Sequence, residues 1–337
     1  MAETSTIEWT DATWNPVTGC SVVSPGCTNC YAMRLAGKRM KHHESRAGLT
    51  IPTKAGPVWN GQVRLNEQWL DQPLRWKRRR MIFVCAHGDL FHEAVPDEWI
   101  DRIFAVMALC PQHTFQVLTK RSARMREYCI RPGTAERISK TMGSLACELS
   151  WPRIRAGIVV SVSLLRGDGW PLPNVWLGVS AERQQEADER VPDLLATPAA
   201  IRFVSAEPLL GPVDFENFCD GVKFIDALRG NWMHDCEGPY IERGKPKLDW
   251  IIVGGESGKG ARPMHPDWAR SIRDQCAEAG VPFFFKQWGE WQPLPQWLVG
   301  DGGDYHKFED GTGLHRSGKK VSGRQLDGVE HNGMPGR

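Results

Sequence analysis

Short apolar segments alternate with helix-like segments along most of this 337-residue chain, and each apolar segment ends in polar residues. Chains with this alternation form parallel β/α units joined by right-handed crossovers. A continuously apolar segment such as residues 250–255 (WIIVGG) suits a sheet that is covered on both faces. The sequence therefore predicts an α/β protein with a partial or full β/α (TIM-like) barrel. The expected strands are residues 81–86, 114–118, 174–179, 201–204, 248–253 and 281–285, and the expected helices are residues 31–41, 97–109, 182–196 and 266–279.

The barrel is expected over residues 1–287, with two insertions at about residues 128–173 and 214–247. Residues 44–66 are rich in Gly, Pro and Thr and are expected to form a long excursion. Residues 288–337 are rich in Gly and charge. They are expected to pack on the barrel as an irregular C-terminal extension.

Polar residues and glycines follow the expected strands at the point where each strand ends. The carboxyl ends of the strands form the functional face of β/α barrels, so these residues are expected on one rim. Each of them taken singly also suits a surface or capping role. Together they offer cations, carboxylates and close backbone approach, the mixture that an amino-acid-like cofactor with an ammonium and a carboxylate group needs. The candidate binding residues are Asp89, Lys120, Ser180, Glu182, Glu207, Gly254, Gly255 and Glu256.

Three cysteines near the N-terminus, Cys20, Cys27 and Cys30, have the spacing CxxxxxxCxxC. Thiolates are the usual ligands of iron–sulfur clusters, and a cubane site ordinarily uses four. Three thiols without a nearby fourth indicate a distant fourth ligand or a 4Fe-4S cluster with one open iron. Two alternatives stay open: a structural zinc site completed by a group such as His42 or His43, and three unrelated buried thiols.

The cysteine motif followed by β/α units resembles the radical S-adenosylmethionine superfamily, whose fold is a partial or full β/α barrel. The resemblance implies that Cys20, Cys27 and Cys30 hold a 4Fe-4S cluster whose remaining iron binds S-adenosyl-L-methionine. It also implies an electron donor of the flavodoxin or ferredoxin type. Reductive cleavage of the cofactor would then give a 5′-deoxyadenosyl radical that abstracts hydrogen from a substrate.

The strand ends Gly88-Asp89 and Thr119-Lys120 are distantly similar to those of the spore photoproduct lyase branch of this superfamily. In that branch a Lys and a downstream Ser hold the cofactor carboxylate, which implies this role for Lys120 and Ser180. The chain departs from the commonest superfamily pattern in the long gap between its first two cysteines. Its Gly-Gly-Glu motif at residues 254–256 also comes late, where it is expected to contact ribose or substrate.

Motifs along nearly the whole chain resemble a phage and bacterial family of unknown function, labelled phage protein or three-Cys-motif protein. This second resemblance brings no settled reaction with it. The motifs are TWNPVTGC (13–20), CTNCYA (27–32), DLFHE (89–93), LTKR (118–121), WLGVS (176–180), SAEPLLG (205–211), VGGESG (253–258) and KQWG (286–289).

The formal net charge is only +2, so binding to nucleic acid would need a local basic surface. Residues 75–80 (RWKRRR) supply one, because five cations can neutralise phosphates and Trp76 can stack on a base. A solvated helix end before the strand at Met81 is the alternative. By analogy with spore photoproduct lyase, DNA or a nucleotide is the expected substrate. The alternative function is that of a non-enzymatic nucleic-acid-binding protein with a structural zinc site at the three cysteines. The candidate contacts are Arg75, Trp76, Lys77, Arg78, Arg79 and Arg80.

The sequence predicts a cytoplasmic protein without a membrane partner. No segment approaches the roughly 20 apolar residues of a membrane span, and residues 1–10 lack the order of a signal peptide. Ten cysteines at irregular spacing do not resemble a secreted disulfide scaffold. Five of them lie in or beside apolar segments and are expected in the core: Cys85, Cys110, Cys129, Cys147 and Cys276.

Overall fold

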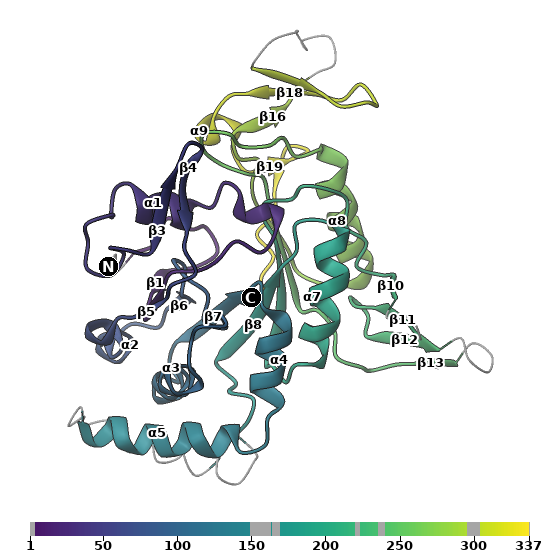
Figure 1. Ribbon diagram of the computed structural model, residues 1–337. Helices are drawn as coiled ribbons and strands as arrows, with labels where there is room; N and C mark the ends of the chain where they lie inside the picture. The colour runs from purple at the N-terminus through teal and green to yellow at the C-terminus, as the bar shows by residue number, and fades with distance from the viewer. Residues whose placement is uncertain are drawn as a thin grey trace. The chain divides into compact units, whose positions relative to one another are not determined.

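A curled, open sheet of seven parallel strands is the central element of the computed structural model, which describes residues 4–148, 163, 169–219, 223–234, 240–294 and 304–336. The strands follow one another in the sheet in chain order, as right-handed β/α connections produce. The predicted partial β/α barrel is therefore confirmed, and such a barrel is an enzyme-type fold. In order, the strands are β1 (Ala12–Trp14), β6 (Met81–Val84), β7 (Thr114–Thr119), β8 (Val175–Ser180), β9 (Ile201–Ala206), β14 (Trp250–Gly254) and β15 (Phe283–Gln287) (Figure 1).

The strand residues are buried as a sheet covered on both faces requires. Every residue of β6 and of β14 is buried. Val84 of β6 pairs with Trp14 on one side and with Val117 on the other. The ring of Trp14 lies 5.8 Å from that of Phe115, so aromatic packing adds to the aliphatic core here.

Helices lie in all four ranges where the sequence predicts them, and the other helices were not predicted. The bounds of α3 (Asp97–Leu109) and α8 (Pro266–Ala279) agree with the expected ranges, and α8 is followed by Gly280, whose φ of 66° is the left-handed C-cap conformation that glycine favours. The helices are α1 (Tyr31–Gly37), α2 (Gln72–Arg75), α3 (Asp97–Leu109), α4 (Ser122–Ile130), α5 (Thr134–Glu148), α7 (Gln184–Ala196), α8 (Pro266–Ala279) and α9 (Lys319–Ser322); the 3₁₀ turns are η1 (Pro25–Cys27) and η2 (Glu67–Trp69).

The chain forms two compact units. The first comprises residues 1–23, 32–178 and 196–201, and the second comprises residues 24–31, 179–195 and 202–337. This division differs from the barrel and extension that the sequence predicts on either side of residue 287, and it separates Cys20 from Cys27 and Cys30.

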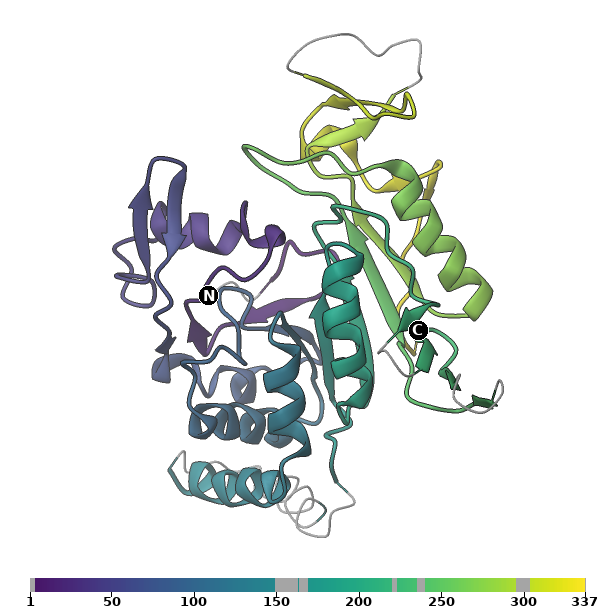
Figure 2. The same ribbon diagram turned by 45° about the vertical axis from the view of Figure 1, so that its right-hand side comes forward.

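In the first unit, α5 lies alongside α3 in both views of the ribbon (Figures 1 and 2). The expected excursion at residues 44–66 contains regular structure. Its strands β3 (Thr50–Thr53) and β4 (Gly56–Trp59) form an antiparallel hairpin, and β5 (Arg64–Leu65) pairs with β2 (Val17–Thr18).

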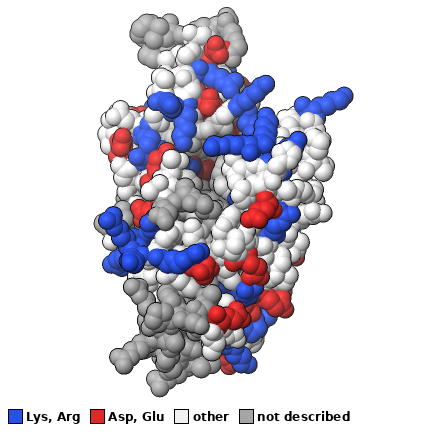
Figure 3. All heavy atoms as spheres, turned by 90° about the vertical axis from the view of Figure 1, so that its left-hand side faces the viewer, with Lys and Arg blue, Asp and Glu red and all other residues white. Residues whose placement is uncertain are grey.

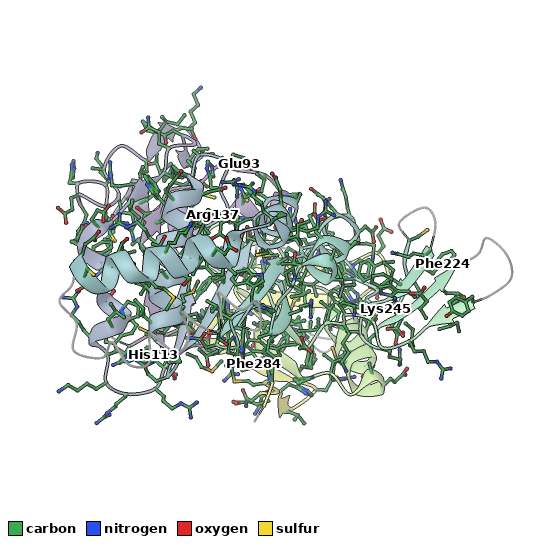
Figure 4. The ribbon with its side chains drawn as sticks, turned by 90° about the horizontal axis from the view of Figure 1, so that it is seen from below. Glu93, His113, Arg137, Phe224, Lys245 and Phe284 are labelled. Carbon is green, nitrogen blue, oxygen red and sulfur yellow. The ribbon has the colours of Figure 1, made fainter. Side chains whose placement is uncertain are left out.

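In the second unit, the expected insertion at residues 214–247 carries a four-stranded antiparallel sheet. Phe224, which Figure 4 labels on this sheet, is an exposed residue. The strands are β10 (Phe218–Cys219), β11 (Lys223–Asp226), β12 (Asn231–His234) and β13 (Tyr240–Glu242).

The prediction of an irregular C-terminal extension is wrong for the described part of residues 288–337. Strands β16 (Trp291–Pro293), β18 (Gly313–Arg316) and β17 (Tyr305–Lys307) form a sheet in that order, and β19 (Gln325–Leu326) pairs with β20 (Val329–Glu330). Short strands with many glycines have weak periodicity, which is why the sequence pattern does not reveal them.

The segment after β20 covers the open edge of β15. The amide of Phe285 donates to the His331 carbonyl at 3.0 Å, and the amide of Gly333 donates to the Phe283 carbonyl at 2.9 Å. An unpaired edge strand would offer these groups to another chain.

Among the described helices, none combines the length and apolar character that crossing a membrane requires.

Candidate functional site

The cysteine loop, defined as residues 19–31, follows β1 and β2 in the chain. Gly19 continues the pairing of the first two sheet strands, because it forms a parallel bridge with Gly88 beyond the end of β6. Its φ is 97°, and an added Cβ would overlap the Gln62 carbonyl, so only glycine fits here. The loop therefore begins at the carboxyl edge of the sheet.

In the first unit, Arg121 contacts the start of the cysteine loop. Its Nη1 donates to the Cys20 sulfur at 3.3 Å, and its Nη2 donates to Ser21 Oγ at 2.6 Å. The Arg121 side chain is 5% exposed. Burial opposes the charged guanidinium, but Asp89, Cys20 and Glu93 outweigh burial, so the pKa of Arg121 is raised. A permanently charged group thus lies beside the Cys20 sulfur.

Asp89 links this arginine to two strand ends. Its Oδ1 accepts hydrogen bonds from Thr119 Oγ1 at 2.7 Å and from the amide of Phe91 at 3.0 Å. Its Oδ2 accepts from the amide of Lys120 and from Arg121 Nη1, both at 3.1 Å. Asp89 and Lys120, both predicted as binding residues, therefore lie together, but the contact that joins them uses the Lys120 backbone.

His92 also contacts Ser21. Its Nδ1 accepts from the amide of Ala94 at 3.1 Å, which leaves the proton on Nε2, 3.1 Å from Ser21 Oγ. Burial and the nearby Arg121 lower the pKa of His92, which favours this neutral form.

In the second unit, Glu182 and Arg190 hold the middle of the cysteine loop. The Glu182 carboxylate is fully buried; it accepts from Arg190 Nη1 at 2.9 Å and from Ser24 Oγ at 2.7 Å. Arg190 Nη1 also donates to the Ser180 carbonyl at 2.9 Å. An added Cβ at Gly26 would overlap the Glu182 carboxylate, so the backbone approaches that carboxylate as closely as glycine permits.

A second carboxylate–arginine pair holds the end of the loop. Glu256 Oε2 accepts from Asn29 Nδ2 at 2.9 Å, and both Glu256 oxygens accept from Arg262. Arg262 Nη2 also donates to the Pro25 carbonyl at 2.9 Å. Burial alone would raise the pKa of Glu256, but hydrogen bonds from Arg262 and Asn29 outweigh burial and lower the pKa.

The two cysteines of the CxxC turn lie in this braced segment. The amide of Cys30 donates to the Cys27 carbonyl at 3.2 Å, which closes the turn between them. The Cys27 sulfur lies 3.8 Å from Ser24 Oγ, the same hydroxyl that donates to Glu182. Cys27 is 8% exposed and Cys30 is partly exposed.

The cysteines outside the loop differ from these. Burial raises the pKa of Cys85, Cys129 and Cys276 to about 12, so these thiols stay protonated at neutral pH. They and Cys110 are buried as predicted, whereas the prediction for Cys147 is wrong, since Cys147 is exposed on α5.

The surroundings of Cys20 suit a metal-binding thiolate. Metal-binding thiolates are favoured by nearby positive charge and partial exposure. Cys20 has both, with the Arg121 guanidinium beside its sulfur. Of the two histidines named for a zinc site, the Nδ1 of His43 is hydrogen-bonded to Ser45 Oγ at 2.7 Å, and His42 is exposed.

Glu207 is the strand-end carboxylate that pairs with a lysine. Lys286 Nζ lies 2.9 Å from Glu207 Oε1, and Ser205 Oγ donates to Oε2 at 3.2 Å. Gly254 lies against this carboxylate, because an added Cβ would be 2.5 Å from Oε1. Gly255 instead lies against the Trp288 carbonyl, which an added Cβ would overlap. Both glycines thus serve close packing at the carboxyl ends of β14 and β15.

Sequence reasoning missed the basic partners of these carboxylates. The signal was present for Arg121, which directly follows Lys120 in LTKR, and for Arg262, six residues after Glu256. Arg190 is eight residues from Glu182, on the inner side of α7. Spacing of this kind does not identify an ion pair without knowledge of the turn between the partners.

The structure corrects one part of the nucleic-acid prediction. Trp76 is 5% exposed; the guanidinium of Arg80 lies over its ring at 5.0 Å, and the ring of His113 packs edge-on against it. Trp76 is therefore not available to stack on a base. The side chains of the other members of the run, Arg75, Lys77, Arg78 and Arg79, are exposed.

Charge on the surface is mixed. In Figure 3, Lys and Arg form several separate groups among Asp and Glu on the face it draws.

A second cluster, His265, Asp267 and Asp310, brings three possible metal ligands together. His265 Nδ1, however, accepts from the amide of Asp267, and Nε2 lies 3.0 Å from Asp310, so both ring nitrogens are already hydrogen-bonded.

Comparison with known proteins gives a family over nearly the whole chain. Residues 4–335 match the family described as "Protein of unknown function (DUF5131)". The chain belongs to the DUF5131 family. No curated protein and no solved structure matches it. The cysteine loop and all three arginines that brace it lie within the part of the chain that defines the family.

Proposed function

We propose that this DUF5131 protein is a radical S-adenosylmethionine-type enzyme with a 4Fe-4S cluster held by Cys20, Cys27 and Cys30. One observation carries the proposal: in each unit the cysteine loop is tied to carboxyl ends of sheet strands by a buried carboxylate and an arginine. These pairs are Asp89–Arg121, Glu182–Arg190 and Glu256–Arg262. Cysteine segments that are braced at the carboxyl ends of sheet strands are the arrangement that such chemistry needs.

The residues have separate roles in the proposal. Lys120 and Ser180 bind the cofactor carboxylate, and Glu207, Gly254 and Gly255 contact the rest of the ligand. Asp89, Glu182 and Glu256 act through the loop, because protein donors already occupy their oxygens. When bound, the cluster supplies one electron, received from a flavodoxin or ferredoxin, to cleave S-adenosyl-L-methionine. The proposed substrate class is nucleic acid, on the basis of the exposed cations at residues 75–79.

Anaerobic reconstitution tests the proposal. The wild-type protein should become brown, bind about four irons per chain and cleave S-adenosyl-L-methionine when reduced. Cys27→Ala should lose all three properties. Cys219→Ser, which changes an exposed cysteine outside the loop, should retain them. Colourless protein with stoichiometric zinc would instead support the structural zinc site.

A further inference from the structure

Arg121 uses every nitrogen of its guanidinium group within the first unit. Nη1 donates to Cys20 Sγ at 3.3 Å and to Asp89 Oδ2 at 3.1 Å. Nη2 donates to the hydroxyl and the carbonyl of Ser21, at 2.6 and 3.4 Å. Nε donates to Glu93 at 3.3 Å. The group therefore has one orientation, fixed by four residues.

The hydrogen bond from Arg121 to the Cys20 sulfur is not needed to hold the cysteine loop in place. Asp89 already neutralises the guanidinium, and Ser21 already ties it to the cysteine loop. An N–H···S hydrogen bond and a nearby positive charge both stabilise electron density on a ligating sulfur. In metal–sulfur centres, such hydrogen bonds set the reduction potential, and loss of such outer partners weakens metal binding.

We propose that Arg121 is a positioning residue of the metal centre: it fixes the Cys20 sulfur at the carboxyl edge and, by donating to that sulfur, raises both the metal affinity and the reduction potential of the centre. The inference rests on the proposed function for the identity of the metal group. The contact itself lies within one unit and concerns only residues of this chain. Arg121 belongs to none of the binding sets that the sequence predicts.

Two variants of Arg121 and one matched control test this role. Arg121→Gln removes the charge and shortens the donor, whereas Arg121→Lys keeps the charge without the planar fork. Arg124→Gln is the control on α4, since its guanidinium bonds to Val95 and Asp97 rather than to the loop. Thermal unfolding of each variant establishes that it is folded before the metal measurements.

The first readout is the reduction potential of the reconstituted protein, followed by electron paramagnetic resonance in the absence of S-adenosyl-L-methionine. We expect a lower potential for Arg121→Gln, a partial return towards the wild-type value for Arg121→Lys, and no shift for Arg124→Gln. A folded Arg121→Gln variant with the wild-type potential overturns the proposal.

The second readout needs no cluster. The metal-free protein is titrated with Cd²⁺, and binding is followed by thiolate-to-metal absorbance. Arg121→Gln should reduce the affinity by about 10- to 100-fold, and it should have no further effect in a Cys20→Ser background. An equal loss in both backgrounds would mean that Arg121 acts only through the fold, which overturns the proposal. Wild-type protein that couples Arg121 to Cys20 in this cycle but assembles no iron cluster refutes the proposed function and the effect on reduction potential, and it leaves the role of Arg121 in metal affinity standing.

Discussion

At the scale of single residues, the carboxylates at the strand ends divide into two kinds. Asp89, Glu182 and Glu256 each pair with an arginine, and their oxygens accept from donors in or beside the cysteine loop. Glu207 pairs instead with Lys286 and accepts from the hydroxyl of its own strand's Ser205. Buried charges are stable only when paired and hydrogen-bonded, so the first three are fixed parts of the scaffold. Glu207 and Lys286 are the pair best placed to exchange partners with a ligand.

The pairing of Asp89 can be tested by its stability. Asp89→Asn leaves the buried Arg121 without its principal counter-charge, which should lower the free energy of unfolding by about 3 kcal/mol. Glu93→Gln is the matched control, because Glu93 bonds the same arginine with a side chain that is 64% exposed. It should cost less than about 1 kcal/mol. Equal losses for the two variants in urea unfolding would contradict the assigned role of Asp89.

His87 should make stability depend on pH. Burial and the nearby Arg46 lower its pKa from 6.5 to about 4. Because the unfolded chain takes up this proton at a higher pH than the folded one, stability should fall as the pH decreases from 6.5 through 4, by at most about 3 kcal/mol from this residue. His87→Gln should flatten the dependence measured by urea unfolding over this range. A variant with the wild-type slope would assign the dependence to other histidines.

At the scale of elements, the tail after β20 protects an open sheet edge. Besides its bonds to β15, it accepts from the indole of Trp250, whose Nε1 donates to the Gly333 carbonyl at 2.7 Å. Glycine is needed at position 333 because the tail lies close to β15: an added Cβ would be 2.7 Å from the Phe283 carbonyl oxygen. A side chain at this position must push the tail away from the strand.

Gly333→Ala should therefore loosen the edge. We expect a loss of about 1 to 2 kcal/mol of stability, from hydrogen bonds that lengthen or break, and faster hydrogen exchange at the Phe285 amide. Gly143→Ala is the control, since an added methyl group there meets nothing within 4 Å. In the middle of α5 this change should stabilise the protein by up to about 1 kcal/mol. Unchanged exchange at Phe285 in Gly333→Ala would show that the edge tolerates the methyl group.

At the scale of the whole molecule, the charge is too balanced to attract nucleic acid in general. Any affinity must come from a local surface, because a net charge of +2 spread over 337 residues produces little long-range field. The exposed cations after α2 are the predicted surface. Their binding would depend on phosphates rather than on stacking, since Trp76 is buried.

A double substitution tests this surface. In filter binding to single-stranded DNA, Arg78→Gln with Arg79→Gln should weaken affinity and reduce the slope of log affinity against log salt by about 1 to 2, one for each phosphate that is no longer neutralised. Lys54→Gln, which neutralises an exposed cation of the β3–β4 hairpin, should change neither quantity. Binding that is absent, or that does not respond to salt, would remove this surface from the proposed function.

The sequence by itself determined the order of the main sheet strands and of four helices, because apolar periodicity follows directly from which faces are buried. It also determined that Cys27 and Cys30 are neighbours, because one turn joins them. Only the tertiary structure decided which distant groups contact the cysteine loop. Arg121 contacts Cys20 from 101 residues away, and Glu182 accepts from Ser24 from 158 residues away. It likewise decided that Trp76 is core and that the C-terminal extension contains strands. The spacing of apolar residues along the chain reflects which of them are buried. An ion pair between distant residues depends instead on the turns and the register that bring strand ends to one edge.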